Sequence, residues 1–211
     1  METVSCGSGP GAPAIEFRNV SLSFDQTRAL DDVSFELSHG QMIVITGLSL
    51  SGKSVLLHLA IGLLEPDEGE ILIEGRAIRD LDERELLVLR SSRMGLVFQE
   101  DTLFTSMTVY ENTAYRLMEH NWSEEDTDRA VEEILRFVGL EKDIEKLPEE
   151  LSIGMRRRLE IARGLAGWPP IMLFDEPTSG LDPITARQVL DLVIRARDIH
   201  NIASLNVTKE L

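Results

Sequence analysis

The sequence predicts an α/β fold with a mainly parallel sheet, antiparallel strands at the N-terminus and an inserted helical subdomain. Three observations support this prediction. A glycine-rich loop lies between an apolar strand and a helix, several later runs are apolar throughout, and the chain from Gln99 to Trp168 follows a helical period. Runs that are apolar throughout are typical of parallel strands, because such strands are covered on both faces.

Composition limits the class of protein. A chain of 211 residues with 43% hydrophobic residues can bury a substantial core. The formal charge of −16 argues against a nucleic-acid partner, since binding nucleic acid requires a basic surface. Cys6 is the single cysteine, so no disulfide framework is possible and a reducing compartment is expected. No uninterrupted apolar run approaches the ~20 residues needed to cross a bilayer.

The N-terminal part contains a leader and then short strands. Residues 1–13 are rich in glycine, proline and serine, lack the features of a signal peptide, and are predicted to be disordered. Residues 15–17 and 33–37 alternate apolar and polar side chains, as half-buried strands do. Another short strand is predicted at 71–73, and a His39-Gly40 turn leads into the strand at 42–45.

The later part alternates between buried strands and helices. Runs at 94–98, 171–174 and 203–207 are predicted to be strands of the parallel sheet. Between them, a helix begins after the Ser123 cap and ends at Gly139, and a second helix covers 153–166. One domain is therefore predicted over 14–211, with an α/β core at 14–99 and 167–211 and a helical subdomain at about 100–166.

The glycine-rich loop carries the most specific motif. It fits G-x-x-x-x-G-K-[ST] and consists of Gly47, Leu48, Ser49, Leu50, Ser51, Gly52, Lys53 and Ser54. Backbone N–H groups in such a loop, together with the helix N-terminus behind it, form a nest for a polyphosphate. Lys53 is expected to reach the β- and γ-phosphates, and Ser54 is expected to place its hydroxyl on Mg²⁺. The sequence therefore predicts binding of a nucleoside triphosphate.

A pair of carboxylates ends the strand at 171–174. Asp175 at this position is expected to lie beside the glycine-rich loop and hold Mg²⁺. Glu176, one residue later, is a candidate general base for a water in line with the γ-phosphate. An isolated Asp-Glu pair is more often a solvated strand end, but a phosphate loop upstream in the same chain favours the catalytic interpretation.

These motifs resemble a known family. Residues 151–155 (LSIGM) and 175–182 (DEPTSGLD) are similar to motifs of the nucleotide-binding subunits of ABC transporters, in the same order. The resemblance covers residues 15–211 and implies a P-loop NTPase core of the ABC type that binds ATP and Mg²⁺ and hydrolyses ATP.

The resemblance also implies roles for individual residues. Phe24 would stack on the adenine, although a lone phenylalanine is more often a core or edge residue. Gln99 would contact the γ-phosphate, Mg²⁺ and the membrane permease. Ser152 and Gly154 of the signature loop, residues 151–155, would close over the ATP of a second cassette. Asp182 would lie in a loop that contacts that cassette, so a homodimer is expected.

A narrower resemblance concerns the transported molecule. Residues 98–112, 117–120 and 181–186 are similar to lipid-trafficking ATPases of the Mla, or mammalian-cell-entry, type. This implies a cytoplasmic protein, peripheral on the inner membrane of a bacterium, that powers transport of phospholipid or another hydrophobic molecule.

Three residues depart from the family pattern. Leu50 and Ile153 replace glycines, the first in the phosphate loop and the second in the signature loop. Lys209 occupies the position of the switch histidine, and an ammonium only donates hydrogen bonds whereas imidazole also accepts them. Lys209 is still a candidate to neutralise γ-phosphate charge, but these departures predict slow turnover with ATP binding retained. The chain ends two residues later, as expected of a short or truncated member.

Three functions therefore remain open from the sequence. The leading one is an ATP-hydrolysing transport subunit, and the second is a nucleotide-binding regulatory subunit with little hydrolysis. A third, an ABC ATPase acting on DNA or ribosomes, is disfavoured by the acidic charge and the single cassette. Arg156, Arg157 and Arg158 are interpreted as a solvated helix face, and Trp122 and Trp168 as packing or turn residues.

Overall fold

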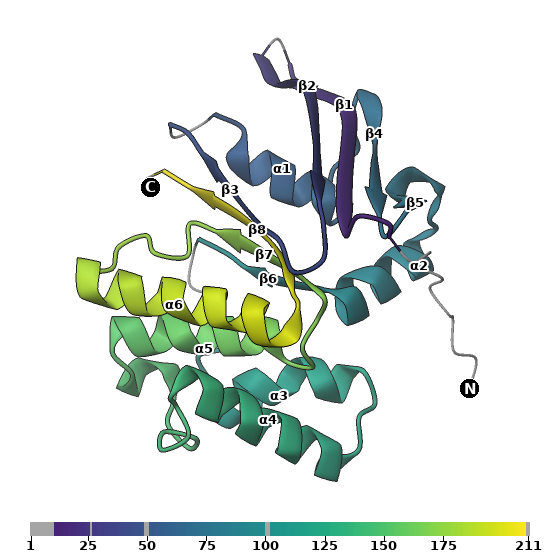
Figure 1. The fold of residues 1–211 in the computed structure, drawn as a ribbon. Helices are drawn as coiled ribbons and strands as arrows, with labels where there is room; N and C mark the ends of the chain where they lie inside the picture. Colours follow the sequence, from purple (N-terminus) through teal and green to yellow (C-terminus); the bar gives the residue numbers. More distant parts are fainter. Residues whose placement is uncertain (1–10, 26, 49–50, 100–101, 210–211) are drawn as a thin grey trace.

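The computed structural model describes residues 11–25, 27–48, 51–99 and 102–209. Most of the predicted leader lies outside these ranges. The described chain forms two sheets that lie against each other, with a group of helices below the second sheet in the view of Figure 1. No helix in the described part of the chain combines the length and the apolar character that a membrane crossing requires.

The first sheet is antiparallel and has the order β2-β1-β4-β5. Its strands are β1 (Ile15–Phe24), β2 (Thr27–Leu37), β4 (Glu68–Ile73) and β5 (Arg76–Ala77). β1 and β2 are longer than predicted. Shifts in register between Phe17, Val20 and Leu22 interrupt the alternation along β1, so sequence periodicity detects only its first residues.

The second sheet is parallel and has the order β3-β8-β7-β6, as the apolar runs predict. Its strands are β3 (Met42–Thr46), β6 (Met94–Val97), β7 (Ile171–Asp175) and β8 (Ala203–Thr208). Every residue of β7 is buried, because the two faces of this strand pack into different cores. Ile171 and Leu173 belong to one core, and Met172 and Phe174 belong to the other.

The helices are α1 (Lys53–Ala60), α2 (Glu83–Val88), α3 (Val109–Glu119), α4 (Glu124–Val138), α5 (Ile153–Leu165) and α6 (Pro183–His200). Shorter helical turns cover Ile78–Asp80, Leu89–Arg93 and Pro148–Glu150. The predicted caps of α4 are confirmed, since the Ser123 side chain accepts a hydrogen bond from the Asp126 N–H and Gly139 is left-handed. The periodicity arguments did not specify α2, α3 or α6.

Two hydrophobic cores lie on opposite faces of the parallel sheet. The first lies between this sheet, α1 and the antiparallel sheet. The second joins α3, α4, α5 and α6 to the other face. α5 approaches β6 closely, because a Cβ atom on Gly95 would lie 2.3 Å from the Gly164 carbonyl oxygen. The helical part therefore shares its core with the sheet, and the division at residues 100–166 remains a prediction.

Candidate functional site

The carboxyl ends of the parallel strands bring the predicted residues to one edge of the sheet. Ile45 of β3 pairs with Val207 of β8, which pairs with Asp175 of β7. Neighbouring strands are about 4.8 Å apart, so β3 and β7 are separated by about 10 Å. The phosphate loop after β3, Lys209 after β8 and Glu176 after β7 consequently begin side by side, in the region shown in Figure 1 where these strands end.

In the phosphate loop, residues 47–54, Gly52 has the backbone that a glycine permits. Gly52 caps α1 with φ of 83°, and a Cβ atom there would lie 2.5 Å from the Ala29 carbonyl oxygen. The buried Lys53 ammonium donates hydrogen bonds to the carbonyl oxygens of Gly47 at 2.7 Å and Leu48 at 2.6 Å. Lys53 thus lies across the start of its own loop, where a phosphate would compete for its ammonium.

Of the other four residues of this loop, the structure describes two. Ser51 is exposed and Ser54 is half-buried in the first turn of α1. Ser49 and Leu50 lie outside the described residues, so the expected strain at Leu50 remains a prediction.

Asp175 has the environment of a metal-binding carboxylate. Its side chain is 8% exposed, and its Oδ1 atom has no hydrogen-bond partner among the described residues. A buried carboxylate oxygen without a partner is costly, and oxygen atoms are the ligands that Mg²⁺ prefers. This orphaned atom, together with the Ser54 hydroxyl at the start of α1, fits the predicted Mg²⁺ site.

Glu176 and Lys209 form an ion pair that the sequence analysis did not foresee. The Lys209 ammonium lies 2.9 Å from the Glu176 carboxylate, which is nearly buried while Lys209 is 40% exposed. The Glu176 backbone is left-handed, with φ of 47°, and its N–H donates to the Val207 carbonyl oxygen at 2.8 Å. This backbone bond ties Glu176 to Val207 of β8. Val207 stands two residues before Lys209 in the sequence.

Gln99 lies just beyond β6, and its backbone is held by an arginine. The Arg157 guanidinium donates to the carbonyl oxygens of Phe98 at 3.0 Å and Gln99 at 3.2 Å, and it pairs with Glu160 at 2.5 Å. Arg157 is buried, so its interpretation as part of a solvated helix face is wrong. A glutamate three residues later on the same helix face was the signal that could have indicated a buried pair.

The signature loop leads directly into α5. Ser152 caps this helix, its hydroxyl oxygen accepting a hydrogen bond from the Met155 N–H at 3.3 Å. Ile153 is 62% exposed, so its side chain points to solvent and does not distort the loop within this chain. A Cβ atom on Gly154 would lie 2.7 Å from the Thr185 methyl carbon, which explains why glycine fits where α5 meets α6.

Asp182 caps α6 and accepts hydrogen bonds from the backbone N–H groups of Ile184 at 3.0 Å and Thr185 at 3.1 Å. Hydrogen bonds from the Thr185 side chain and backbone hold the pKa of Asp182 below its usual value. The predicted role of Asp182 in a dimer therefore coexists with a structural role in this chain.

The lowered pKa predicts how Asp182 contributes to stability. Because its pKa is depressed in the folded state, the stabilisation is complete above the unfolded pKa and is lost as pH falls through the folded pKa. In Asp182→Asn, which keeps the cap acceptor, we expect the urea midpoint to depend less on pH in the acid range than in the unmodified chain. Parallel pH profiles of the two proteins would contradict this assignment.

Phe24 is 45% exposed at the end of β1, where it pairs with Thr27 across the hairpin. The same hairpin brings Ala29 against Gly52 of the phosphate loop. An exposed ring therefore lies on a hairpin beside this loop, as the predicted adenine contact requires.

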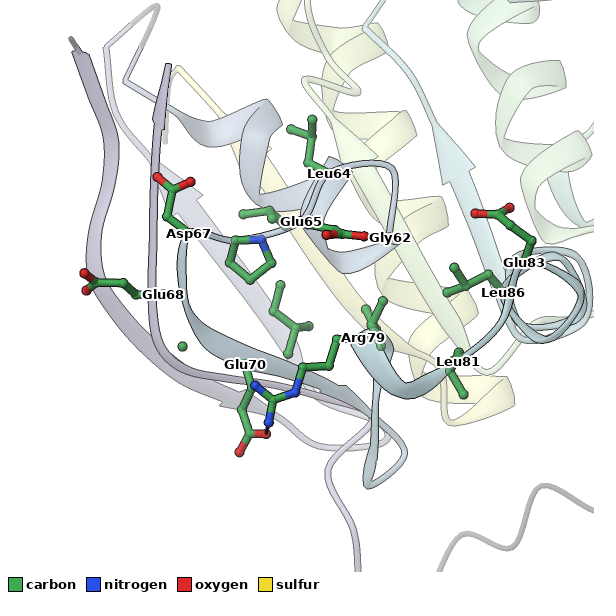
Figure 2. Close-up of a pocket in the computed structure, with 15 residues that line it drawn as sticks. Gly62, Leu64, Glu65, Asp67, Glu68, Glu70, Arg79, Leu81, Glu83 and Leu86 are labelled. Atoms are coloured by element: carbon green, nitrogen blue, oxygen red, sulfur yellow. Dashed lines mark hydrogen bonds and ion pairs between the residues drawn. The ribbon is translucent and has the colours of Figure 1, made fainter. Parts of the chain in front are cut away.

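Two surface hollows lie away from the phosphate loop. One, of about 450 Å³, is lined by β4, the turn at 78–80 and α2, with carboxylates around an apolar floor (Figure 2). None of the predicted site residues that the structure describes lines it. The other, of about 590 Å³, lies between the sheet and the helices and includes Leu87, Val88, Phe98 and Tyr115.

Comparison with known proteins agrees with this geometry. The ABC transporter family matches residues 30–179. The chain is 42% identical to the probable ribonucleotide transport ATP-binding protein mkl of Mycobacterium leprae, over 89% of this chain and 54% of that protein. It is 37% identical to the methionine import ATP-binding protein MetN of Cutibacterium acnes, over 99% of this chain and 58% of that protein.

A solved structure has the same fold. The dimeric bacterial ABC transporter cassette MJ0796 superimposes with a TM-score of 0.83 at 32% identity, covering 93% of this chain and 88% of that one. The chain spans little more than half the length of the two relatives named above. The predicted P-loop α/β fold is confirmed, and the chain belongs to the ABC transporter family as an ATP-binding cassette of the ABC ATPase type.

Proposed function

We propose that this chain binds MgATP at the carboxyl ends of β3, β7 and β8 and hydrolyses it to drive transport through a membrane permease. The observation that carries the proposal is the pair Asp175-Glu176 at the end of β7, on the same sheet edge as the phosphate loop. Asp175 there presents an unpartnered buried oxygen, and Glu176 presents a nearly buried carboxylate.

Each residue has a stated task in this proposal. Residues 47–54 bind the phosphates through backbone N–H groups, and Lys53 leaves its loop carbonyls to pair with the β- and γ-phosphates. Ser54, Asp175 and Gln99 would hold Mg²⁺, which when bound neutralises part of the phosphate charge. Glu176 accepts a proton from the attacking water, since it directly follows Asp175 at the end of β7 and its carboxylate is a suitable base. Phe24 stacks on the adenine.

The proposed partners are a second copy of the chain and a permease. Ser152 and Ile153 are exposed at the start of α5, so the signature loop is free to cover the nucleotide of another cassette. The dimer reported for the similar MJ0796 cassette supports this arrangement. The hollow of about 590 Å³ next to Gln99 presents exposed Leu63 and Leu87, apolar side chains that fit a short permease segment.

The location and the substrate follow from this partnership and from sequence. A cassette that docks on a permease is peripheral on the cytoplasmic face of the inner membrane. Transport of a phospholipid or other hydrophobic solute rests on the sequence resemblance at residues 98–112, 117–120 and 181–186 alone. The relatives named above are described as transporting ribonucleotides or methionine, and these solutes are the alternatives to test.

A second candidate function is a regulatory subunit that binds ATP and hydrolyses little of it. The Lys209–Glu176 ion pair favours this candidate, because an ammonium 2.9 Å from the base competes with water for its carboxylate. Turnover would then be limited by this one contact and not by the phosphate loop.

Phosphate release by Lys209→His decides between the two candidates. If the chain is a working motor restrained by Lys209, the histidine variant should hydrolyse MgATP about tenfold faster than the unmodified chain, as expected when one charged hydrogen bond to the base is removed. Lys142→Met, at an exposed position, serves as the control and should leave the rate unchanged. If the unmodified chain and Lys209→His both bind ATP but release no phosphate above background, the regulatory function is favoured.

A further inference from the structure

The hollow of about 450 Å³ between β4 and α2, which we call the acidic hollow, lies apart from the residues assigned to the nucleotide. Leu64 and Leu81 are half-buried in its lining. The buried side chains of its floor are also apolar, and they are Leu59, Ile71, Ile78 and Leu86. A hollow of this size with an apolar floor can accept the apolar side chains of a ligand.

Five carboxylates line the acidic hollow, together with one guanidinium, that of Arg79. Glu70 pairs with Arg18 at 3.0 Å and with Arg79 at 3.3 Å. Asp67 accepts a hydrogen bond from the Ser23 N–H at 2.8 Å. The other three carboxylates are exposed and have no hydrogen bond or ion pair within the described part of the chain, and they are Glu65, Glu68 and Glu83. The rim therefore carries negative charge that this chain does not neutralise.

The walls of the acidic hollow are fixed by local contacts. Gly62 has φ of 66°, and a Cβ atom there would lie 3.0 Å from the Ile78 side chain. The Arg90 guanidinium donates to the Gly62 carbonyl oxygen at 2.7 Å. Asp82 caps α2, its carboxylate accepting a hydrogen bond from the Glu85 N–H at 2.8 Å. Because these walls are already ordered, a ligand would not have to order them on binding.

The positions of the free carboxylates indicate what kind of ligand fits. Figure 2 shows Glu68 and Glu83 on opposite sides of the acidic hollow, with Leu64 and Leu81 between them in that view. A small ion with a single positive charge can pair with one side only. A peptide segment with two basic side chains on either side of apolar ones complements both sides and the floor at once.

The second hollow, of about 590 Å³, has a different chemistry. Two glutamates and three arginines line it, and the arginines are Arg90, Arg116 and Arg163. The acidic hollow has five carboxylates and one guanidinium. A segment that suits one of these linings does not suit the other, so the acidic hollow calls for a ligand of its own.

We propose that the acidic hollow is a docking site for a basic amphipathic segment of a partner protein, in which two arginine or lysine side chains flank apolar ones. The apolar side chains cover Leu64 and Leu81, and the basic side chains pair with the free carboxylates on the two sides. This inference goes beyond the proposed function and does not depend on ATP binding at residues 47–54.

Fluorescence anisotropy with a synthetic peptide tests the site. The labelled probe contains two leucines flanked by two arginines, between glycines, and a second peptide replaces both leucines by serine. Both are titrated at low ionic strength, where exposed charges are least screened. The site variant is Glu65→Gln/Glu68→Gln/Glu83→Gln. The matched control makes the same change of net charge at three exposed glutamates of another part of the chain, and it is Glu141→Gln/Glu145→Gln/Glu149→Gln.

The proposal predicts a specific pattern of affinities. The leucine peptide should bind the unmodified chain and the matched control equally, and it should bind the site variant about tenfold more weakly, since each exposed ion pair contributes a factor of about two. The serine peptide should bind the unmodified chain at least about fivefold more weakly than the leucine peptide, because it leaves the apolar floor uncovered. The site variant should keep this preference for leucine, since its floor is unchanged.

Other outcomes would overturn the proposal in distinguishable ways. Equal weakening in the site variant and the matched control would show that the net charge of −16 attracts the peptide without a specific site. Equal affinity for the two peptides would show that the floor is not used. If argininamide bound as tightly as the leucine peptide, the hollow would be a site for a small cation.

Two further measurements complete the test. Sedimentation without peptide should show the same mass for the unmodified chain and the site variant, and a dimer lost only in the site variant would assign the hollow to a second copy of this chain. If the site variant does not fold, Glu68→Gln and Glu83→Gln must each weaken binding about twofold, and no change in either would reject the proposal. No binding of the leucine peptide by the unmodified chain would also reject it, and would leave the proposed ATP hydrolysis unaffected.

Discussion

Glu176→Gln is expected to lower the MgATP turnover of this chain by about 10²–10⁴-fold, the usual contribution of a general base. The variant keeps the shape of the side chain and its bond to Val207 but removes the carboxylate that would accept the proton of water. MgATP binding should not weaken, because the phosphate loop and Asp175 are untouched. Phosphate release and nucleotide affinity, measured on the same preparation, check both parts.

The control for this experiment is Glu149→Gln, which makes the same chemical change at an exposed position in the turn at 148–150. Its turnover should equal that of the unmodified chain. If Glu176→Gln retained the turnover of this control, another group would accept the proton of the attacking water, and Glu176 would not be the base.

Lys53→Met is expected to weaken binding of MgATP by at least about tenfold and to leave no measurable turnover, since hydrogen bonds from a charged donor contribute about 1.5–3 kcal/mol. The lysine is buried at the start of α1, and within the described part of the chain its ammonium donates to the Gly47 and Leu48 carbonyl oxygens. Methionine has a similar length without the charge, so the loss of MgATP affinity measures the contribution of the ammonium. Isothermal titration with MgATP and with AMP is the measurement.

AMP binding provides the internal comparison for Lys53→Met. AMP lacks the β- and γ-phosphates that Lys53 is proposed to contact, so its affinity should change little. Lys142→Met, which removes an exposed lysine, should bind both nucleotides as the unmodified chain does. Equal loss of AMP and ATP binding would indicate collapse of the loop and contradict a specific phosphate contact.

Local sequence patterns predicted the parts of the fold that have local causes. The strand and the helix at 42–60 follow from an apolar run and a helix start, and the structure forms β3 and α1 there, with Gly52 as the cap of α1. The fully apolar run at 171–174 predicted a strand buried on both faces, and β7 is buried at every residue. Because parallel strands end at one edge, the same patterns also placed Asp175 beside the phosphate loop.

Contacts between distant segments were not predictable in this way. The sequence identified Lys209 as a departure from the family, but its ion pair with Glu176 depends on the register of β7 against β8. Arg157 was likewise assigned to solvent. In a run of three arginines the sequence does not show which side chain turns inward, and it is Arg157 that donates to the Phe98 and Gln99 carbonyls. Periodicity reports which face of an element is buried, and it carries no information on which atoms meet there.

Steady-state phosphate release from MgATP by the unmodified chain, with Glu176→Gln as the blank and with a co-expressed permease as a second condition, tests the proposed hydrolysis most directly. We predict turnover clearly above the blank, raised further by the permease. Turnover equal to the blank under both conditions, with MgATP bound, would contradict hydrolysis at the edge formed by β3, β8 and β7.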